Sequence, residues 1–94
     1  MRLSQATDYA LRIVLHLAGR EPGEVVTAET VAGSEKIPLR FLLKIARDLI
    51  AAGIVKSQRG SAGGYVLARD PREITLLDVV EAVEGPVRMN RCLI

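Results

Sequence analysis

Apolar residues recur every three or four positions in three separate stretches of the chain, which is the spacing of one face of an α-helix. The pattern therefore predicts three amphipathic helices, each with one buried stripe. The expected stripes are Ala6, Tyr9, Ala10, Ile13, Val14, Leu17 and Ala18; Leu39, Leu42, Leu43, Ala46, Leu49 and Ile50; and Leu76, Val79, Val80 and Val83.

Residues that favour helix ends flank each of these stretches. The starts are Ser4 or Thr7, Pro38 at the first helical position, and Thr75; the ends are Gly19, Gly53 and Gly85-Pro86. Asp78 lies three residues after Thr75, a spacing that resembles a capping box.

The first helix has an apolar arc wider than one stripe. Leu11 and Leu15 extend the arc, which predicts a second packing partner for this helix. Asp8, Arg12 and His16 fall on the opposite face, and we expect His16 to be exposed.

A shorter helix precedes the second long one. The residues 21–24 predict a turn and Val25-Val26 a short strand, after which Thr27 caps a brief helix through Ala32. The residues 33–36 predict a turn. A short helix, a turn and a longer helix that begins near a proline form a helix-turn-helix.

A glycine-rich segment follows this pair of helices. Arg59-Gly60-Ser61-Ala62-Gly63-Gly64 separates the apolar ends of two short segments, 54–58 and 65–68, which predicts a β-hairpin. Glycine lets the main chain approach a bulky surface closely, and we expect that surface to be DNA. The whole order predicts a mostly α protein with a small β-hairpin, a winged helix-turn-helix.

Charge is distributed unevenly along the 94 residues. The net charge is only +2, but residues 36–72 carry eight basic and two acidic side chains, whereas the rest carries five basic and nine acidic ones. A basic middle is typical of a surface that binds a polyanion, although a solvated surface of uneven charge gives the same count.

The second helix of the pair carries a basic row opposite its leucines. Arg40, Lys44 and Arg47 are spaced i, i+4, i+7. Arg40 and Lys44 are candidates for contacts with bases in the major groove, and Arg47 for a phosphate contact. Phe41, beside them, is either a core residue or a contact for a thymine methyl group.

The composition and motifs of the chain argue against a membrane protein, a secreted protein and an enzyme. The chain has one cysteine, no stretch long enough to span a membrane and no signal-peptide core, which favours a cytoplasmic protein of one domain. No nucleophile–base pair, metal-ligand spacing or phosphate-binding loop predicts an enzyme. The alternative to DNA binding is a winged-helix interaction module whose basic face binds an acidic protein.

The segment 37–68, with its RGSAGGYVLA sequence, resembles the Rrf2 family of bacterial winged helix-turn-helix transcriptional regulators. The resemblance implies a homodimer on a palindromic DNA operator, with Arg59 in the minor groove beside Gly60 and Ser61. It also implies phosphate contacts by Ser4, Tyr9 and Thr27. Since Leu43 stands where some relatives carry a polar residue, we expect an operator that differs from theirs or one that relies more on Arg40 and Lys44.

Cys92 lies where cluster-bearing relatives have the first of three iron–sulfur ligands. One thiolate cannot hold a cluster, so Cys92 is either an idle thiol or a residue that forms a disulfide or shares a metal between protomers. We expect a DNA-binding domain over residues 1–86, the start of a sensor segment over 87–94, and a fragment of a longer regulator, with a naturally short variant as the alternative. The predicted function is a repressor linked to iron–sulfur or redox sensing.

Overall fold

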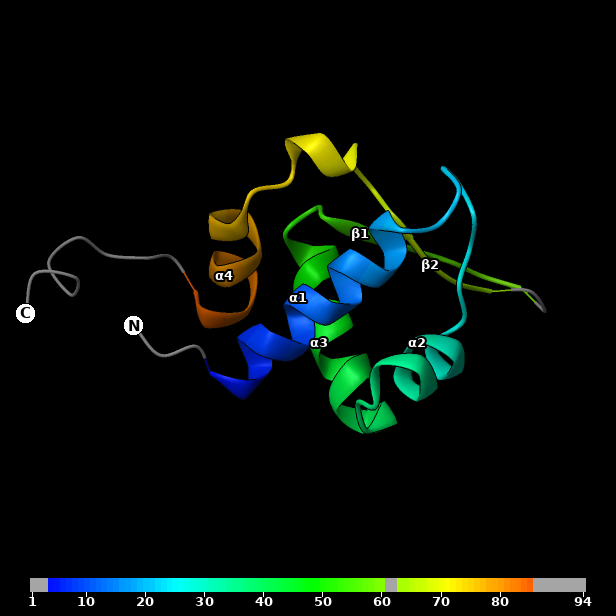
Figure 1. Ribbon diagram of the computed structural model, residues 1–94, viewed down its shortest axis with the longest axis horizontal. Coiled ribbons are helices and arrows are strands. Elements are labelled where there is room, and N and C mark those ends of the chain that lie inside the picture. The colour runs from blue at the N-terminus through cyan, green and yellow to red at the C-terminus, as the bar shows by residue number, and fades with distance from the viewer. Residues whose placement is uncertain (1–3, 61–62, 86–94) are drawn as a thin grey trace, which may run out of the picture.

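The computed structural model describes residues 4–60 and 63–85. Its elements follow the order helix, helix, helix, hairpin, helix (Figure 1). They are α1 (Gln5–Ala18), α2 (Ala28–Glu35), α3 (Leu39–Ala51), β1 (Val55–Gln58), β2 (Gly64–Leu67), a 3-10 turn (Pro71–Glu73) and α4 (Leu76–Glu84). This architecture confirms the predicted winged helix-turn-helix.

Helix ends follow the predicted capping chemistry. The Ser4 hydroxyl accepts a hydrogen bond from the Thr7 amide at 3.1 Å and so caps α1. At α4, Thr75 and Asp78 form a reciprocal capping box, with both bonds at 3.0 Å. Side chains that satisfy the free amides of a first turn fix where a helix begins.

The core is aliphatic and lies where α1, α2, α3 and the hairpin meet. Ile13, Leu42, Leu49 and Ile54 are at most 1% exposed. α4 packs against both α1 and α3, while the hairpin projects to the other side of the helices (Figure 1). Among the described residues, no helix is long and apolar enough to cross a membrane.

The predicted stripe of α3 was partly wrong. Leu42, Ala46 and Leu49 are buried as expected, and Ile45 joins them. The other three members of the α3 stripe are exposed: Leu39, Leu43 and Ile50. In the α4 stripe, Leu76 is exposed as well. The buried face of α3 is the one that packs against α1, α2 and α4, and the expected stripe was centred to one side of it.

The turn between α2 and α3 comes later than predicted. α2 continues through Gly33 to Glu35, and the chain reverses at Lys36, whose φ of 58° is left-handed. The Ile37 amide donates to the Ala32 carbonyl at 2.9 Å, and the Ile37 side chain is buried. This closing bond and apolar contact end the helix as in a Schellman motif. Pro38 is the N-cap of α3 and not its first residue.

His16 is not exposed as predicted. Its side chain is 8% exposed, and its Nδ1 lies 2.8 Å from a carboxylate oxygen of Glu35. Arg12, one turn earlier, donates to the backbone carbonyl of Glu35 at 3.1 Å. The end of α2 therefore covers His16 on the polar face of α1, and sequence periodicity contains no sign of this contact.

The hairpin begins and ends close to its predicted bounds. Val55 pairs with Leu67 and Gln58 with Gly64 in an antiparallel register. The segment Val25-Val26 does not form a strand, because only Val26 pairs, through two bonds of 2.7 and 2.9 Å with the backbone of Tyr65. This bridge fastens the hairpin to the segment that enters α2.

Candidate nucleic-acid interface

The exposed face of α3 carries the predicted basic row. Arg40, Lys44 and Arg47 are all exposed, and the opposite face of the helix is buried in the core. The structure therefore brings these three side chains onto one surface, with the hydrophobic core as a rigid support behind them.

Apolar side chains border the basic row on both sides. Leu39, Leu43 and Ile50 lie along one edge, each 37–41% exposed. Phe41 lies along the other edge at 39% exposed, so it is not a core residue. Such edges suit thymine methyl groups, which are the apolar features of the major groove. In the sequence, the apolar residues of α3 span an arc too wide for one packing face, and this width indicates that some of them must be exposed.

Phe41 instead links α3 to α1. Its ring lies 6.5 Å from that of Tyr9 between centroids, at an angle of 31°. The Arg40 guanidinium lies 5.0 Å from the centre of the Phe41 ring, and that of Arg12 lies 5.9 Å from the centre of the Tyr9 ring. The two arginines and two rings form a cation–aromatic cluster at the first turn of α3.

The tip of the hairpin presents Arg59. This side chain is exposed directly after β1, and Gly60 follows with a φ of 115°, which only glycine adopts without strain. The Gly63 amide closes the turn by donating to the Gly60 carbonyl at 3.0 Å. Ser61 lies outside the described residues.

Gly63 and Gly64 are both required by close contacts within the chain. A Cβ on Gly63 would lie 2.6 Å from the Gln58 carbonyl oxygen, and one on Gly64 would lie 2.3 Å from that of Val26. The protein's own backbone therefore requires glycine at these two positions, whereas the approach of the hairpin to DNA stays a prediction.

Tyr65 is a residue at this surface that sequence reasoning missed. It is partly buried beside the α2 carboxylate of Glu29 and the α3 guanidinium of Arg47. Burial is the main cause that raises the pKa of the Tyr65 hydroxyl; Glu29 raises it further and Arg47 lowers it. Tyr65 thus marks the point where α2, α3 and the hairpin meet.

The hydroxyls of Thr27 and Ser4 already serve as helix caps. Thr27 accepts from the Thr30 amide at 3.1 Å. The Ser4 hydroxyl donates to the Glu84 carboxylate, whose negative charge opposes a phosphate at the same position. A phosphate would have to compete with these contacts.

Ion pairs divide the basic residues of the described chain into two groups. Arg12, Arg20, Arg69 and Arg72 each pair with a carboxylate. No ion pair within the described residues involves the cations of the helix-turn-helix and hairpin, which are Lys36, Arg40, Lys44, Arg47, Lys56 and Arg59. These six side chains therefore have no direct carboxylate partner in the described part of the fold.

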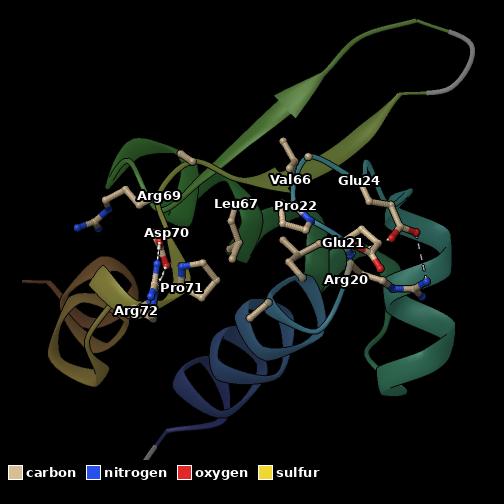
Figure 2. A pocket seen from close by; sticks show the side chains of 14 residues that line it. Arg20, Glu21, Pro22, Glu24, Val66, Leu67, Arg69, Asp70, Pro71 and Arg72 are labelled. Carbon is tan, nitrogen blue, oxygen red and sulfur yellow. Dashed lines mark hydrogen bonds and ion pairs between the residues drawn. The ribbon is translucent and has the colours of Figure 1, made fainter.

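A cleft beside the end of α1 is lined by arginines of the paired group. It has a volume of about 450 Å³ and lies between the end of α1, the turn at 21–24 and the segment after β2. Figure 2 shows Arg72 beside Asp70 and Arg20 beside Glu24 at its rim. With these cations held by carboxylates, the cleft does not resemble an anion site.

The described residues do not form a metal site. No three His, Cys, Asp or Glu side chains among residues 4–60 and 63–85 gather in a way that could hold a metal ion. Cys92 lies outside the described residues.

A helix-turn-helix with a basic second helix, followed by a hairpin with an arginine at its tip, defines the winged helix-turn-helix class of DNA-binding proteins. Residues 3–93 match the model of one family in this class, Rrf2, described as an iron-dependent transcriptional regulator. The chain belongs to the Rrf2 family, which confirms the resemblance seen in the sequence.

Individual relatives agree with this assignment. The chain is 39% identical over 91 residues to the putative HTH-type transcriptional regulator Rv1287 of Mycobacterium tuberculosis. The match covers 97% of this chain and 56% of that protein. It is 34% identical over 92 residues to the regulator NsrR of Bacillus subtilis, with 98% and 63% covered. The chain thus spans little more than half the length of such relatives.

A solved structure supports the fold in the same way. The structure of CymR, the global cysteine regulator of B. subtilis, superimposes with a TM-score of 0.86 at 32% identity. The match covers 92% of this chain and 67% of CymR.

Proposed function

We propose that this chain binds operator DNA in a sequence-specific manner and regulates transcription, as a repressor, without catalysing a reaction. The observation that carries the proposal is the division of charge: six cations of the helix-turn-helix and hairpin make no ion pair within the described residues. Cations that have no carboxylate partner favour a polyanion, and the fold around them is one that places a helix in the major groove.

Each basic side chain has a proposed role. Arg40 and Lys44, in the first half of α3, contact base edges, where an arginine can engage guanine through two hydrogen bonds. Arg47, further along the helix, contacts phosphate. Arg59 at the hairpin tip enters the minor groove, whose narrow parts attract arginine.

The proposal extends to the assembly that binds DNA. The protein binds a palindromic operator as a homodimer, because a two-fold protein axis requires two matching half-sites. Residues 1–86 form its DNA-binding domain, and residues 87–94 begin a sensor segment. Because the ligand is chromosomal DNA, the proposed location is the cytoplasm.

A link to iron or redox state is the second part of the proposal. It is supported by the description of the family and by Cys92. Since the described residues form no metal site and a cluster usually needs four ligands, Cys92 would require ligands from other segments or another protomer. Reconstitution of the 94-residue chain with iron and sulfide should therefore give no stable cluster absorption.

The wing arginine provides the main test. A duplex selected from a random library serves as the operator, and its affinity is measured for wild type and Arg59→Ala. The expected loss is roughly 1–3 kcal/mol, or about 5- to 150-fold. Arg72→Ala is the matched control, because it also removes one arginine charge. Arg72 pairs with Asp70 beside α4 and lies far from the tip of the hairpin, so this variant should change the operator affinity little (Figure 2).

Two outcomes would contradict the proposal. An unchanged affinity in Arg59→Ala would remove the wing from DNA recognition. If the library yields no sequence that wild type prefers over random duplex, the basic face is better explained as a site for an acidic protein.

A further inference from the structure

The base-reading candidate Arg40 does not extend freely from α3. Its guanidinium lies over the ring of Phe41 at 5.0 Å from the centroid. Neither Lys44 nor Arg47 has a cation–aromatic contact within the described residues. Among the three basic residues of the row, Arg40 alone has its charged group supported in this way.

The support beneath Arg40 is itself fixed. Phe41 contacts the Tyr9 ring, and Tyr9 lies near the guanidinium of Arg12. Arg12 is held at 3.0 Å by the Asp8 carboxylate and at 3.1 Å by the Glu35 carbonyl oxygen. These contacts connect Phe41 to the body of α1 and to the end of α2, so the ring has a defined position.

A fixed ring under a guanidinium changes how an arginine binds. A free arginine loses much rotamer entropy when it orders, and a two-bond contact with guanine requires one orientation of the planar group. A side chain that is already held in place loses less on binding, which is the effect of preorganisation.

We propose that Phe41 is a specificity-determining residue that positions the Arg40 guanidinium for a guanine, with Tyr9 as the support for its ring. The inference rests on the proposed function. It adds that Phe41 affects base recognition through Arg40 and does not contact a base itself. Phe41 is 39% exposed because one side of its ring serves Arg40 while its other contacts face α1.

A double-mutant cycle tests this role. In a selected operator, the base pair at which Arg40→Ala loses most discrimination is identified first. Phe41→Leu should lower the preference for that base pair about two- to fivefold, the size of an exposed cation–aromatic contact. In an Arg40→Ala background the same substitution should have no effect. Equal losses in both backgrounds would overturn the proposal.

Further variants separate positioning from packing and from direct contact. Phe41→Tyr keeps the ring and should keep the preference, and Phe41→Met replaces Phe41→Leu if the latter does not fold. Replacing operator thymines by deoxyuracil removes their methyl groups. If this change abolishes the effect of Phe41→Leu, the ring contacts a methyl group directly and the positioning role is wrong.

The two proposals fail in different ways. A wild-type protein without sequence preference contradicts the proposed function itself. A selective wild-type protein with an additive Arg40–Phe41 cycle contradicts only the role of Phe41.

Discussion

Gly64 and Gly33 are the same residue type in opposite environments. At Gly64, a Cβ would lie 2.3 Å from the carbonyl oxygen and 2.6 Å from the carbonyl carbon of Val26. At Gly33, inside α2, a Cβ would meet no atom within 4 Å. The first glycine is required by the bridge between hairpin and α2, whereas the second only adds flexibility to a helix.

These environments predict opposite effects of one substitution. Gly64→Ala should lower the free energy of unfolding by about 1–3 kcal/mol, because backbone atoms must move to admit the methyl group. Gly33→Ala should raise it by about 0.5–1 kcal/mol, because alanine is the better helix former and the space is open. Urea unfolding of both variants gives the two values, and a shared sign would contradict this account.

At the scale of elements, Glu84 ties the end of α4 to the start of α1. Its carboxylate accepts hydrogen bonds from the Ser4 hydroxyl and, at 2.7 Å, from the Thr7 hydroxyl, which is buried. These two bonds lower the pKa of Glu84, and the bond from Ser4 has the larger effect. Burial acts in the opposite direction. A negative charge at the N-terminus of α1 is also favourable to the helix dipole.

The Glu84 contact predicts a pH dependence of stability. Because the pKa of Glu84 is lower in the folded than in the unfolded chain, its ionised form stabilises the fold above the unfolded value near 4.5. This contribution is lost as the pH falls through the folded value. The stability difference between wild type and Glu84→Gln should therefore be largest near neutral pH and shrink in acid.

Urea unfolding of both proteins at pH 7 and at pH 3 measures that difference. Asp78, whose pKa is also lowered by its capping bonds to Thr75, titrates in both proteins and cancels in the comparison. A difference that stays constant with pH would mean that Glu84 acts by packing alone.

At the scale of the whole molecule, the fold separates its charges. Carboxylates pair with Arg12 of α1, with Arg20 just after it, and with Arg69 and Arg72 of the segment after β2. Among the described residues, the six cations of the helix-turn-helix and hairpin make no ion pair, and the three on α3 lie on its exposed face. A net charge of only +2 thus coexists with a group of basic side chains that carboxylates do not pair.

This separation predicts how salt affects DNA binding. Affinity should fall steeply with salt, since each phosphate neutralised contributes about −0.9 to the slope of log K against log salt concentration. Arg47→Ala should reduce the magnitude of that slope by about one, while Arg72→Ala should leave it unchanged. Titrations of the selected operator at several salt concentrations give the slopes, and equal slopes for the two variants would contradict the charge division.

The sequence by itself determined the three long helices, the capping box at Thr75, the hairpin and the basic row of α3, but not the end of α2 or the N-cap of α3. These features depend on residues within about four positions of one another, through the helical repeat and the bonding of free amides at helix ends. Thr75 and Asp78 could be paired from their spacing alone, and so could Arg40, Lys44 and Arg47 on one face.

Only the tertiary structure decided which side chains are covered and which charges are free. The His16 side chain is largely covered because the end of α2 lies over it, and Leu43 is exposed because no described element covers that side of α3. Likewise, Gly64 is needed because Val26, distant in sequence, passes beside it. Burial and charge pairing depend on neighbours brought together by the whole fold, and the periodicity of a single segment does not contain them.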